Sequence, residues 1–182
     1  LTPASVAVAG YRLNHFLARR GLGPLAKVGK YVVIWLCGIE IDYRAQIGRG
    51  FRIHHGYGAI VSGTIGENVH VNQGVTVGGN WGKRLDGRSL PLIGDNVWIM
   101  AGAKVLGPVQ IGSNVLIGAN SVVLDDIPEN SVVAGVPARV LRSITIEDMQ
   151  RMSPDEARAM AQVKDWPCMI LRCFGLKNTA EG

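Results

Sequence analysis

Aliphatic residues recur at every sixth position through the middle of the chain, and the fifth residue of most six-residue units is small or aliphatic as well. An α-helix repeats every 3.6 residues and a half-buried strand every two, so neither keeps six-spaced positions apolar. The period predicts a β-solenoid, in which each unit is one flat face of a triangular coil. The six-spaced positions are Ile41, Ile47, Ile53, Ala59, Ile65, Val71 and Val77, then Ile93, Ile99, Val105, Ile111, Ile117 and Val123.

Three units complete one coil, so residues three units apart are expected to stack in ladders inside the solenoid. Every member of the three expected ladders is apolar. We therefore predict an all-β solenoid, a parallel β-helix, over residues 39–142. The ladders read Ile47, Ile65, Ile93 and Ile111; Ile53, Val71, Ile99 and Ile117; and Ile41, Ala59, Val77, Val105 and Val123.

The repeat is interrupted once. From Val77 to Ile93 is sixteen residues, ten more than one unit needs, and the intervening segment is rich in Gly, Asn and Asp. This composition is typical of a loop. We expect residues 78–92 to be thrown out of the solenoid, which is a usual place for binding residues.

Short helical segments are expected on both sides of the solenoid. Residues 4–20 and about 25–36 have helical patterns separated by Gly and Pro, so residues 1–38 are predicted to cap the open end of the ladders. An alternative is a basic amphipathic hairpin that associates peripherally with a membrane. The tail, residues 143–182, should contain helices that begin near Thr145 and Ser153. Its function is not readable from the sequence.

Composition narrows the classes of partner. The net charge is +5, with 24 Gly and only 6% aromatic residues in 182. A positive balance suits an anionic ligand such as coenzyme A or a phosphorylated sugar, although it also describes an ordinary solvated surface. No basic helix or aromatic-basic motif points to nucleic acid, which is therefore not an expected partner.

Cysteine usage and the N-terminus favour a cytoplasmic protein. Cys37, Cys168 and Cys173 are odd in number and lack metal-ligand spacing, so we expect reduced thiols. No signal peptide is recognisable. The longest apolar run, residues 31–37, is too short to span a bilayer.

Two adjacent histidines, His54 and His55, are the clearest polar interruption of the repeat. An imidazole can take a proton from a hydroxyl group and return it to a leaving group, as acyl transfer requires. Glu40 lies fifteen residues earlier, and coil stacking could bring its carboxylate to one ring nitrogen. Alternatively, the histidines are surface residues at a corner and Glu40 is solvated. His15 and His70 are weaker candidates, and no pair has the spacing of metal ligands, so no metal is expected.

An ordered series of motifs runs along the chain at Gly38–Asp42, Ile47–His55, Gln73–Gly79, Ala101–Gly107 and Ala134–Arg139, and a further one lies at Arg12–Leu17. This series resembles the serine acetyltransferase family of hexapeptide acyltransferases, and also its saccharide-directed relatives such as the colanic acid acetyltransferases. The resemblance covers about residues 11–142.

The resemblance implies a left-handed parallel β-helix that assembles as a homotrimer, with acetyl-CoA bound between neighbouring subunits. His55 falls on the family's catalytic histidine, and Glu40 falls where an aspartate usually completes the dyad. The Gly79 backbone N–H is the candidate oxyanion donor. Acetyl-CoA is expected along Ala101, Gly102, Ala103, Ala119, Asn120 and Ala138, with Lys83, Arg84, Lys104 and Arg139 as candidates for its phosphates.

The chain departs from the family pattern where the acceptor should bind. His54 replaces an aspartate, and Ser89–Pro91 replaces an Arg-His-Pro motif, although Arg88 lies one residue earlier. The family's long N-terminal helical domain is reduced to about forty residues. A polar site without its charged partners should reject an amino acid. These departures favour a saccharide acceptor, held by His54, Tyr57 and Trp81, in surface-polysaccharide or glycoconjugate biosynthesis.

Two alternatives remain open from the sequence. The first is O-acetylation of L-serine for cysteine biosynthesis, with Arg88 or His54 rebuilding the amino-acid site. The second is a solenoid without catalytic activity that serves as a scaffold, in which His55 and Glu40 are incidental.

Overall fold

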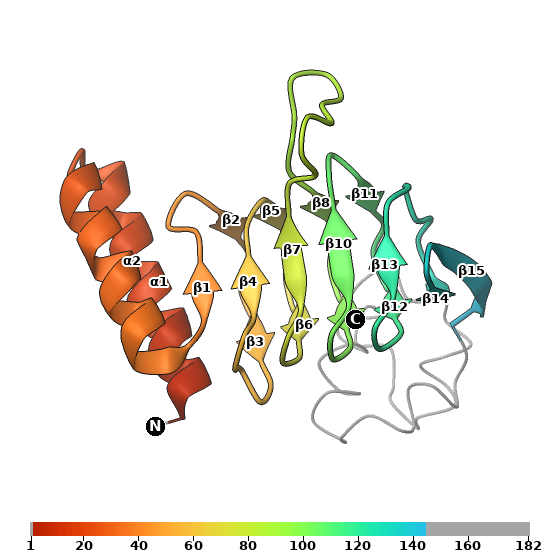
Figure 1. Cartoon of the computed structure of the whole chain (residues 1–182), viewed down its shortest axis with the longest axis horizontal. Helices are drawn as coiled ribbons and strands as arrows, with labels where there is room; N and C mark the ends of the chain where they lie inside the picture. Colours follow the sequence, from red (N-terminus) through yellow and green to blue (C-terminus); the bar gives the residue numbers. More distant parts are fainter. Residues whose placement is uncertain (1, 145–182) are drawn as a thin grey trace, which may run out of the picture. The chain divides into compact units, whose positions relative to one another are not determined.

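The computed structural model describes residues 2–144, which form two helices followed by fifteen short strands (Figure 1). Helix α1, Pro3–Arg19, begins with a capping box between Thr2 and Ser5, which satisfies backbone N–H groups of the first turn. Helix α2, Gly23–Cys37, ends at Gly38, whose φ of +64° suits a glycine C-cap. The tail helices expected near Thr145 and Ser153, and the thiols Cys168 and Cys173, lie outside the described residues.

The strands make three faces of a parallel β-helix. One face has the strand order β1-β4-β7-β10-β13, the second β11-β8-β5-β2, and the third β15-β14-β12-β9-β6-β3. Among the strands of residues 2–144, only β14 and β15 pair antiparallel. The strands are β1 Glu40–Ile41, β2 Gln46–Ile47, β3 Arg52–Ile53, β4 Ile60–Val61, β5 Thr64–Ile65, β6 His70–Val71, β7 Thr76–Gly78, β8 Leu92–Ile93, β9 Trp98–Ile99, β10 Lys104–Leu106, β11 Gln110–Ile111, β12 Leu116–Ile117, β13 Val122–Val123, β14 Ser131–Gly135 and β15 Ala138–Ser143.

The pairing registers confirm two of the predicted ladders in full. The prediction was wrong at one member of the third, because Val61 rather than Ala59 stacks between Ile41 and Val77. From Ile53 to Val61 is eight residues and from Val61 to Ile65 only four, so two extra residues enter one corner and two are lost from the next. Ala59 is also buried and apolar, which concealed the shift.

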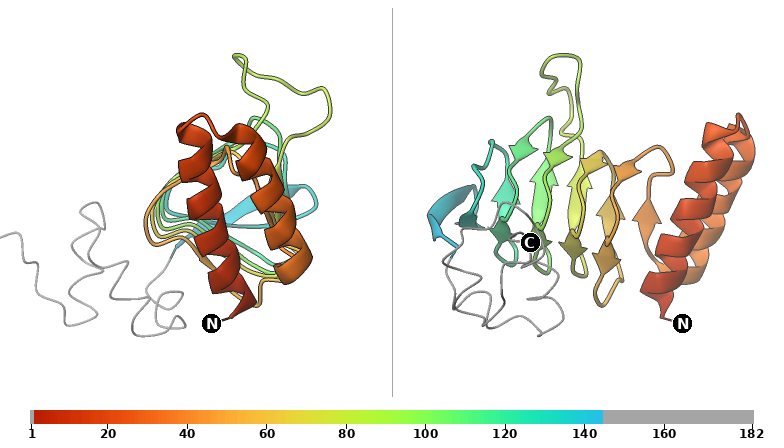
Figure 2. Two further views of the ribbon diagram at one scale, coloured as in Figure 1. Left: turned by 90° about the vertical axis from the view of Figure 1, so that its left-hand side faces the viewer. Right: turned by 180° about the vertical axis from the view of Figure 1, so that it is seen from behind.

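The aliphatic lead residues of the coils are buried in a single core that extends into the helices. Helix α1 is tied to the first coil by hydrogen bonds from Tyr11 Oη to Ala45 O, 2.7 Å, and from the Arg12 guanidinium to Ile47 O and Gly48 O. The end-on view in Figure 2 shows both helices lying across this end of the β-helix. The hairpin therefore shields the first coil from water.

Candidate functional site

The longer corner, residues 54–59, connects β3 to β4 and carries the two adjacent histidines. His54 N donates to Val71 O at 2.7 Å, which keeps the first histidine on the strand, whereas His55 turns the chain with a φ of +53°. Few residues other than Gly adopt this conformation, and it often marks a functional position. The His55 side chain is exposed beside a cavity of about 360 Å³ that α1 and the corner line together.

The ring of His54 is held in a stack with His70 and Trp98 from the next two coils. His54 Nε2 lies 2.9 Å from His70 Nδ1, so one of these nitrogens carries the shared hydrogen. The ring centroids are 5.2 Å apart for His54 and His70, and 4.0 Å for His70 and Trp98. His70 is only 5% exposed. The stack fixes His54, so that the two histidines have different surroundings.

His55 is the more available base. Within residues 2–144, its ring makes none of the hydrogen bonds or ring contacts found for the other three histidines. An exposed imidazole in this position can approach a bound hydroxyl group, as a general base must.

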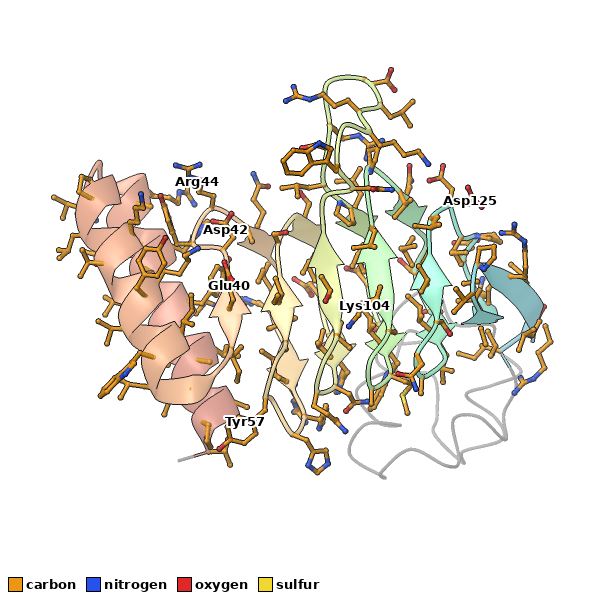
Figure 3. The ribbon with its side chains drawn as sticks, viewed as in Figure 1. Glu40, Asp42, Arg44, Tyr57, Lys104 and Asp125 are labelled. Carbon is orange, nitrogen blue, oxygen red and sulfur yellow. The ribbon has the colours of Figure 1, made fainter. Side chains whose placement is uncertain are left out.

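Glu40 lies beside the histidine corner through its backbone, because Glu40 N donates to Ala59 O at 2.9 Å. Its carboxylate, however, accepts a hydrogen bond from Lys30 Nζ at 2.9 Å, and this bond raises the pKa of Lys30. Figure 3 labels Glu40 on β1 and Tyr57 on the corner. Only one carboxylate oxygen is used by Lys30, so the predicted pairing with His55 requires the second, and the dyad stays a prediction.

The same corner of each later coil contains Gly or another small residue, and together these corners form a continuous edge. We call it the histidine edge and define it as residues 54–59, 72–75, 100–103 and 118–121. Backbone hydrogen bonds join its members, from Gly74 N to Tyr57 O at 3.0 Å, from Gly102 N to Gln73 O at 2.9 Å and from Asn120 N to Ala101 O at 2.9 Å. The coenzyme A candidates Ala101, Gly102, Ala103, Ala119 and Asn120 therefore follow His55 along one edge.

Glycine leaves the first part of this edge without side chains. At the corner between the second and third faces, the stack begins with Gly50 and continues as Asn68, Asn96, Asn114 and Asn130, whose side chains hydrogen-bond from coil to coil. At the histidine edge, the stacked positions are Gly58, Gly74, Gly102 and Asn120, and the Asn120 side chain fills the space beside Gly102. A side chain added at Gly58 or Gly74 would meet only the backbone of the next glycine. The edge can therefore accept a ligand against its backbone at Gly58 and Gly74.

The basic candidates behave differently from one another. Lys104 Nζ donates to Gly74 O on the histidine edge, so its ammonium group is engaged there. Arg139, on β15, pairs with Asp125 at 3.1 Å, and both side chains are largely exposed. Ala138 is buried at the start of β15. Lys83 Nζ donates to Leu124 O at 3.3 Å, and this hydrogen bond connects the long loop to a later coil.

The loop of residues 79–91 leaves the β-helix between β7 and β8, at the corner between the first and second faces (Figure 1). Leu85 and Arg88 exchange backbone hydrogen bonds around Asp86 and Gly87, which both have positive φ. Trp81 is fully exposed. Arg88 Nη1 is buried without a hydrogen-bond partner among the described residues, beside a cavity of about 390 Å³.

The chain does not bring all the predicted site residues together. His54, His55, Tyr57 and the small residues of the histidine edge share one corner of the coil, whereas Gly79, Trp81, Lys83, Arg84 and Arg88 belong to the loop at the next corner. The first face of the β-helix separates the two (Figures 1 and 2). Their roles in a common site stay predictions.

Sequence reasoning missed Lys30 and Trp98, and it ranked His70 only as a weaker candidate although this side chain is buried. Lys30 is on a helix, where no repeat register predicts its contact with Glu40. His70 and Trp98 both precede a lead residue of the same ladder, Val71 and Ile99, so the register contained the signal for their stacking. No group of three potential metal ligands occurs within residues 2–144. No helix in that range is long and apolar enough to cross a membrane.

Comparisons with known proteins identify relatives of the chain. The model of the bacterial transferase hexapeptide family, six repeats, matches residues 91–125. The chain is 46% identical to serine acetyltransferase of Staphylococcus xylosus over 75% of its own length and 63% of that protein's. It is 37% identical to serine acetyltransferase of Synechococcus elongatus, over 99% of its own length and 73% of that protein's.

Solved structures give the same result. Brucella abortus serine acetyltransferase in complex with coenzyme A matches with a TM-score of 0.74 and 36% identity, over 80% of this chain and 58% of that one. Neisseria gonorrhoeae serine acetyltransferase in complex with serine matches with a TM-score of 0.72 and 34% identity, over 78% and 58%. The chain thus spans less than two thirds of the length of several of these relatives.

Proposed function

The chain belongs to the serine acetyltransferase family of hexapeptide acyltransferases, and we propose that it transfers an acetyl group from acetyl-CoA to the hydroxyl group of L-serine. The observation that carries this proposal is the match to a serine acetyltransferase along nearly the whole chain. The sequence alone favoured a saccharide acceptor. The relatives are named serine acetyltransferases, which supports serine as the acceptor instead.

In the proposed reaction, His55 takes the proton of the serine hydroxyl group, and the oxygen attacks the thioester carbonyl carbon. The C–S bond then breaks, and the coenzyme A sulfur takes the proton back from His55. The products are O-acetylserine and free coenzyme A, so no other reactant is needed. His55 fits this role because its side chain is exposed and its ring nitrogens make no hydrogen bond within residues 2–144.

Glu40 is proposed to orient His55 through the carboxylate oxygen that Lys30 leaves free. A hydrogen bond from the imidazole to a carboxylate fixes the tautomer and stabilises the imidazolium ion that forms. The Gly79 N–H remains our candidate for the oxyanion of the tetrahedral intermediate. Removing one such donor typically raises the barrier by about 2.7–4 kcal/mol.

Acetyl-CoA is proposed to lie along the histidine edge. Its pantetheine arm needs a narrow surface with accessible backbone groups, and the glycines of that edge supply one. A structure of a relative was solved in complex with coenzyme A, which supports the same donor here. Arg84, Arg139, Lys83 and Lys104 are the candidates for its phosphates, and the last three would have to leave Asp125, Leu124 O and Gly74 O respectively to bind them.

A homotrimer is proposed as the working assembly. The loop candidates and His55 lie at different corners of one chain, so a site that uses both sets draws them from neighbouring subunits. Closed cyclic assemblies of identical chains provide such repeated interfaces.

A saccharide acceptor is the second candidate, and the stacked His54 favours it. The family pattern has an aspartate in that position, which would grip the ammonium group of an amino acid. Here an imidazole ring stands in that position and is hydrogen-bonded to His70. Exposed Tyr57 and Trp81 offer further surfaces for a sugar ring.

The deciding experiment measures thiol release from acetyl-CoA with L-serine as the acceptor, using His55→Ala as the control. Turnover that depends on His55 supports serine acetylation. If only slow hydrolysis occurs with serine while a panel of sugars and nucleotide sugars gives His55-dependent turnover, the acceptor is a saccharide. Thiol release that is the same in the variant with every acceptor would overturn the enzymatic assignment.

A further inference from the structure

The helical hairpin exposes an unusual number of large apolar side chains. Nine of the seventeen large hydrophobic residues exposed in the described part of the chain lie between Leu13 and Leu36. Trp35 is 84% exposed, although only isolated apolar side chains are ordinary on a protein surface. The nine are Leu13, Phe16, Leu22, Leu25, Val28, Tyr31, Val32, Trp35 and Leu36.

Four of these residues are aligned along one side of α2. Leu25, Val28, Val32 and Trp35 are spaced by three, four and three residues, so they form one stripe along the helix. Only Ala26 and Cys37 of α2 are buried. The stripe is therefore not needed to cover the first coil, since α1 supplies Ala7 and Tyr11 to the core.

The charge of the hairpin has one sign. The segment before Glu40 contains five Lys and Arg residues and no Asp or Glu. Arg12 and Lys30 face the β-helix, where they bond to backbone carbonyls and to Glu40. Arg19, Arg20 and Lys27 are exposed, and none of them has a carboxylate partner within residues 2–144.

We propose that the hairpin is a docking surface for an anionic lipid membrane, with the stripe of α2 lying in the headgroup region. Amphipathic helices of this kind combine an apolar face that includes Trp with flanking Lys and Arg, and they lie in the plane of the interface. Trp and Tyr side chains prefer that depth. This association does not depend on the proposed acceptor.

A second copy of the chain fits the surface less well. Two hairpins packed on each other would offer Arg19, Arg20 and Lys27 no acid partner, because the segment before Glu40 contains no Asp or Glu. Packing in the parallel direction would also bring like charges together, which is unfavourable at an interface. An anionic surface instead attracts each cation, by about 1 kcal/mol for each residue near it. The charge pattern therefore favours lipid.

The test is sedimentation of the whole chain with vesicles of phosphatidylcholine alone or with about 30 mol% phosphatidylglycerol. We expect binding only to the anionic vesicles, weakening as salt rises from about 0.1 to 0.5 M. The stripe variant Val28→Ser/Val32→Ser/Trp35→Ser should lose about tenfold or more in partitioning, because three apolar contacts are removed. The variant Val140→Ser/Leu141→Ser, exposed on β15, is the matched control and should bind normally.

A second pair of variants separates local charge from net charge. Arg19→Gln/Arg20→Gln/Lys27→Gln should weaken binding, whereas Arg44→Gln/Arg49→Gln/Arg52→Gln, which removes as many charges from exposed positions of the β-helix, should not. Equal partitioning of all variants, or none by the wild type, overturns the proposal. So does a mass by light scattering that grows with concentration and falls only in the stripe variant, because a second copy then covers the hairpin.

Discussion

At the residue scale, one position of each coil decides whether an edge is open or closed. Asn68, Asn96 and Asn114 turn one corner with positive φ and fill it with an amide ladder, whereas Gly58 and Gly74 turn another with the same sign of φ and leave it bare. Both residue types tolerate this backbone, so folding alone does not require the difference. The difference exposes backbone where the donor is proposed to bind.

Replacing Gly74 with Asn tests this interpretation. Asn accepts the φ of +67°, and its Cβ would lie 3.7 Å from Gly102 Cα, an ordinary contact. The fold should therefore persist with a stability change of about 1 kcal/mol or less, while the new side chain occupies the edge. We expect coenzyme A affinity, measured by calorimetry, to fall about tenfold or more, since the ligand loses its backbone surface.

The matched control is Asn96→Gly, at the corner between the second and third faces. This change removes amide hydrogen bonds of the asparagine ladder. It should lower the melting temperature and leave coenzyme A affinity unchanged. If Gly74→Asn binds coenzyme A as tightly as the wild type, the donor does not lie along the histidine edge.

At the element scale, the period of six predicted the coils, the three faces and the long loop, and the helical patterns separated by Gly and Pro predicted the two helices. It did not predict the longer corner, because Ala59 satisfies the period although Val61 holds the ladder position. Periodicity reports burial, and both residues are buried. The His54–His70 contact and the Lys30–Glu40 pair depend on side-chain direction between elements, which a one-dimensional pattern does not contain.

The helical hairpin should loosen from the first coil at alkaline pH. Burial raises the pKa of Tyr11 above its ordinary 10.0, and the hydrogen bond to Glu40 raises the pKa of Lys30 above its ordinary 10.5. For both groups the folded chain holds its proton more tightly, so their stabilisation is complete below the ordinary values and is lost as pH rises through the raised ones. Thermal unfolding at about pH 9 and about pH 11.5 measures this loss.

Single substitutions assign the loss to each group. Tyr11→Phe and Lys30→Met should each reduce the loss of stability between these two pH values, because each removes one of the groups that release a proton. Lys27→Met, at an exposed position of α2, should keep the wild-type slope. Identical slopes in all four proteins would contradict the role given to the two contacts.

At the scale of the whole molecule, a single chain presents two separate sets of site residues. His55 and the glycines lie along the histidine edge, and the loop with Trp81 and Arg88 projects from the next corner (Figure 1). The sequence identified both sets of residues but did not show that they lie at different corners. Positions that are close in the repeat can lie on opposite sides of a face in the folded coil. A site that includes both sets needs two subunits, each giving one.

Subunit mixing tests this arrangement directly. One variant carries His55→Ala, and the other lacks residues 80–89, which restores the six-residue spacing between Val77 and Ile93. Each should be inactive alone. In trimers assembled from equal amounts of both, a site is intact when His55 and the loop come from the right neighbours, which random assortment gives for about a quarter of the sites.

Recovery of about a quarter of the wild-type turnover, in co-expressed and co-purified protein, is therefore expected. The control mixes His55→Ala with a chain that carries both changes, where no intact site can form and activity should stay absent. No recovery in the first mixture would mean that one chain supplies both sets, and activity in the loop-deleted protein alone would remove the loop from the site. The second result would also remove Lys83 and Arg84 as candidates for the phosphates of coenzyme A, because both belong to that loop.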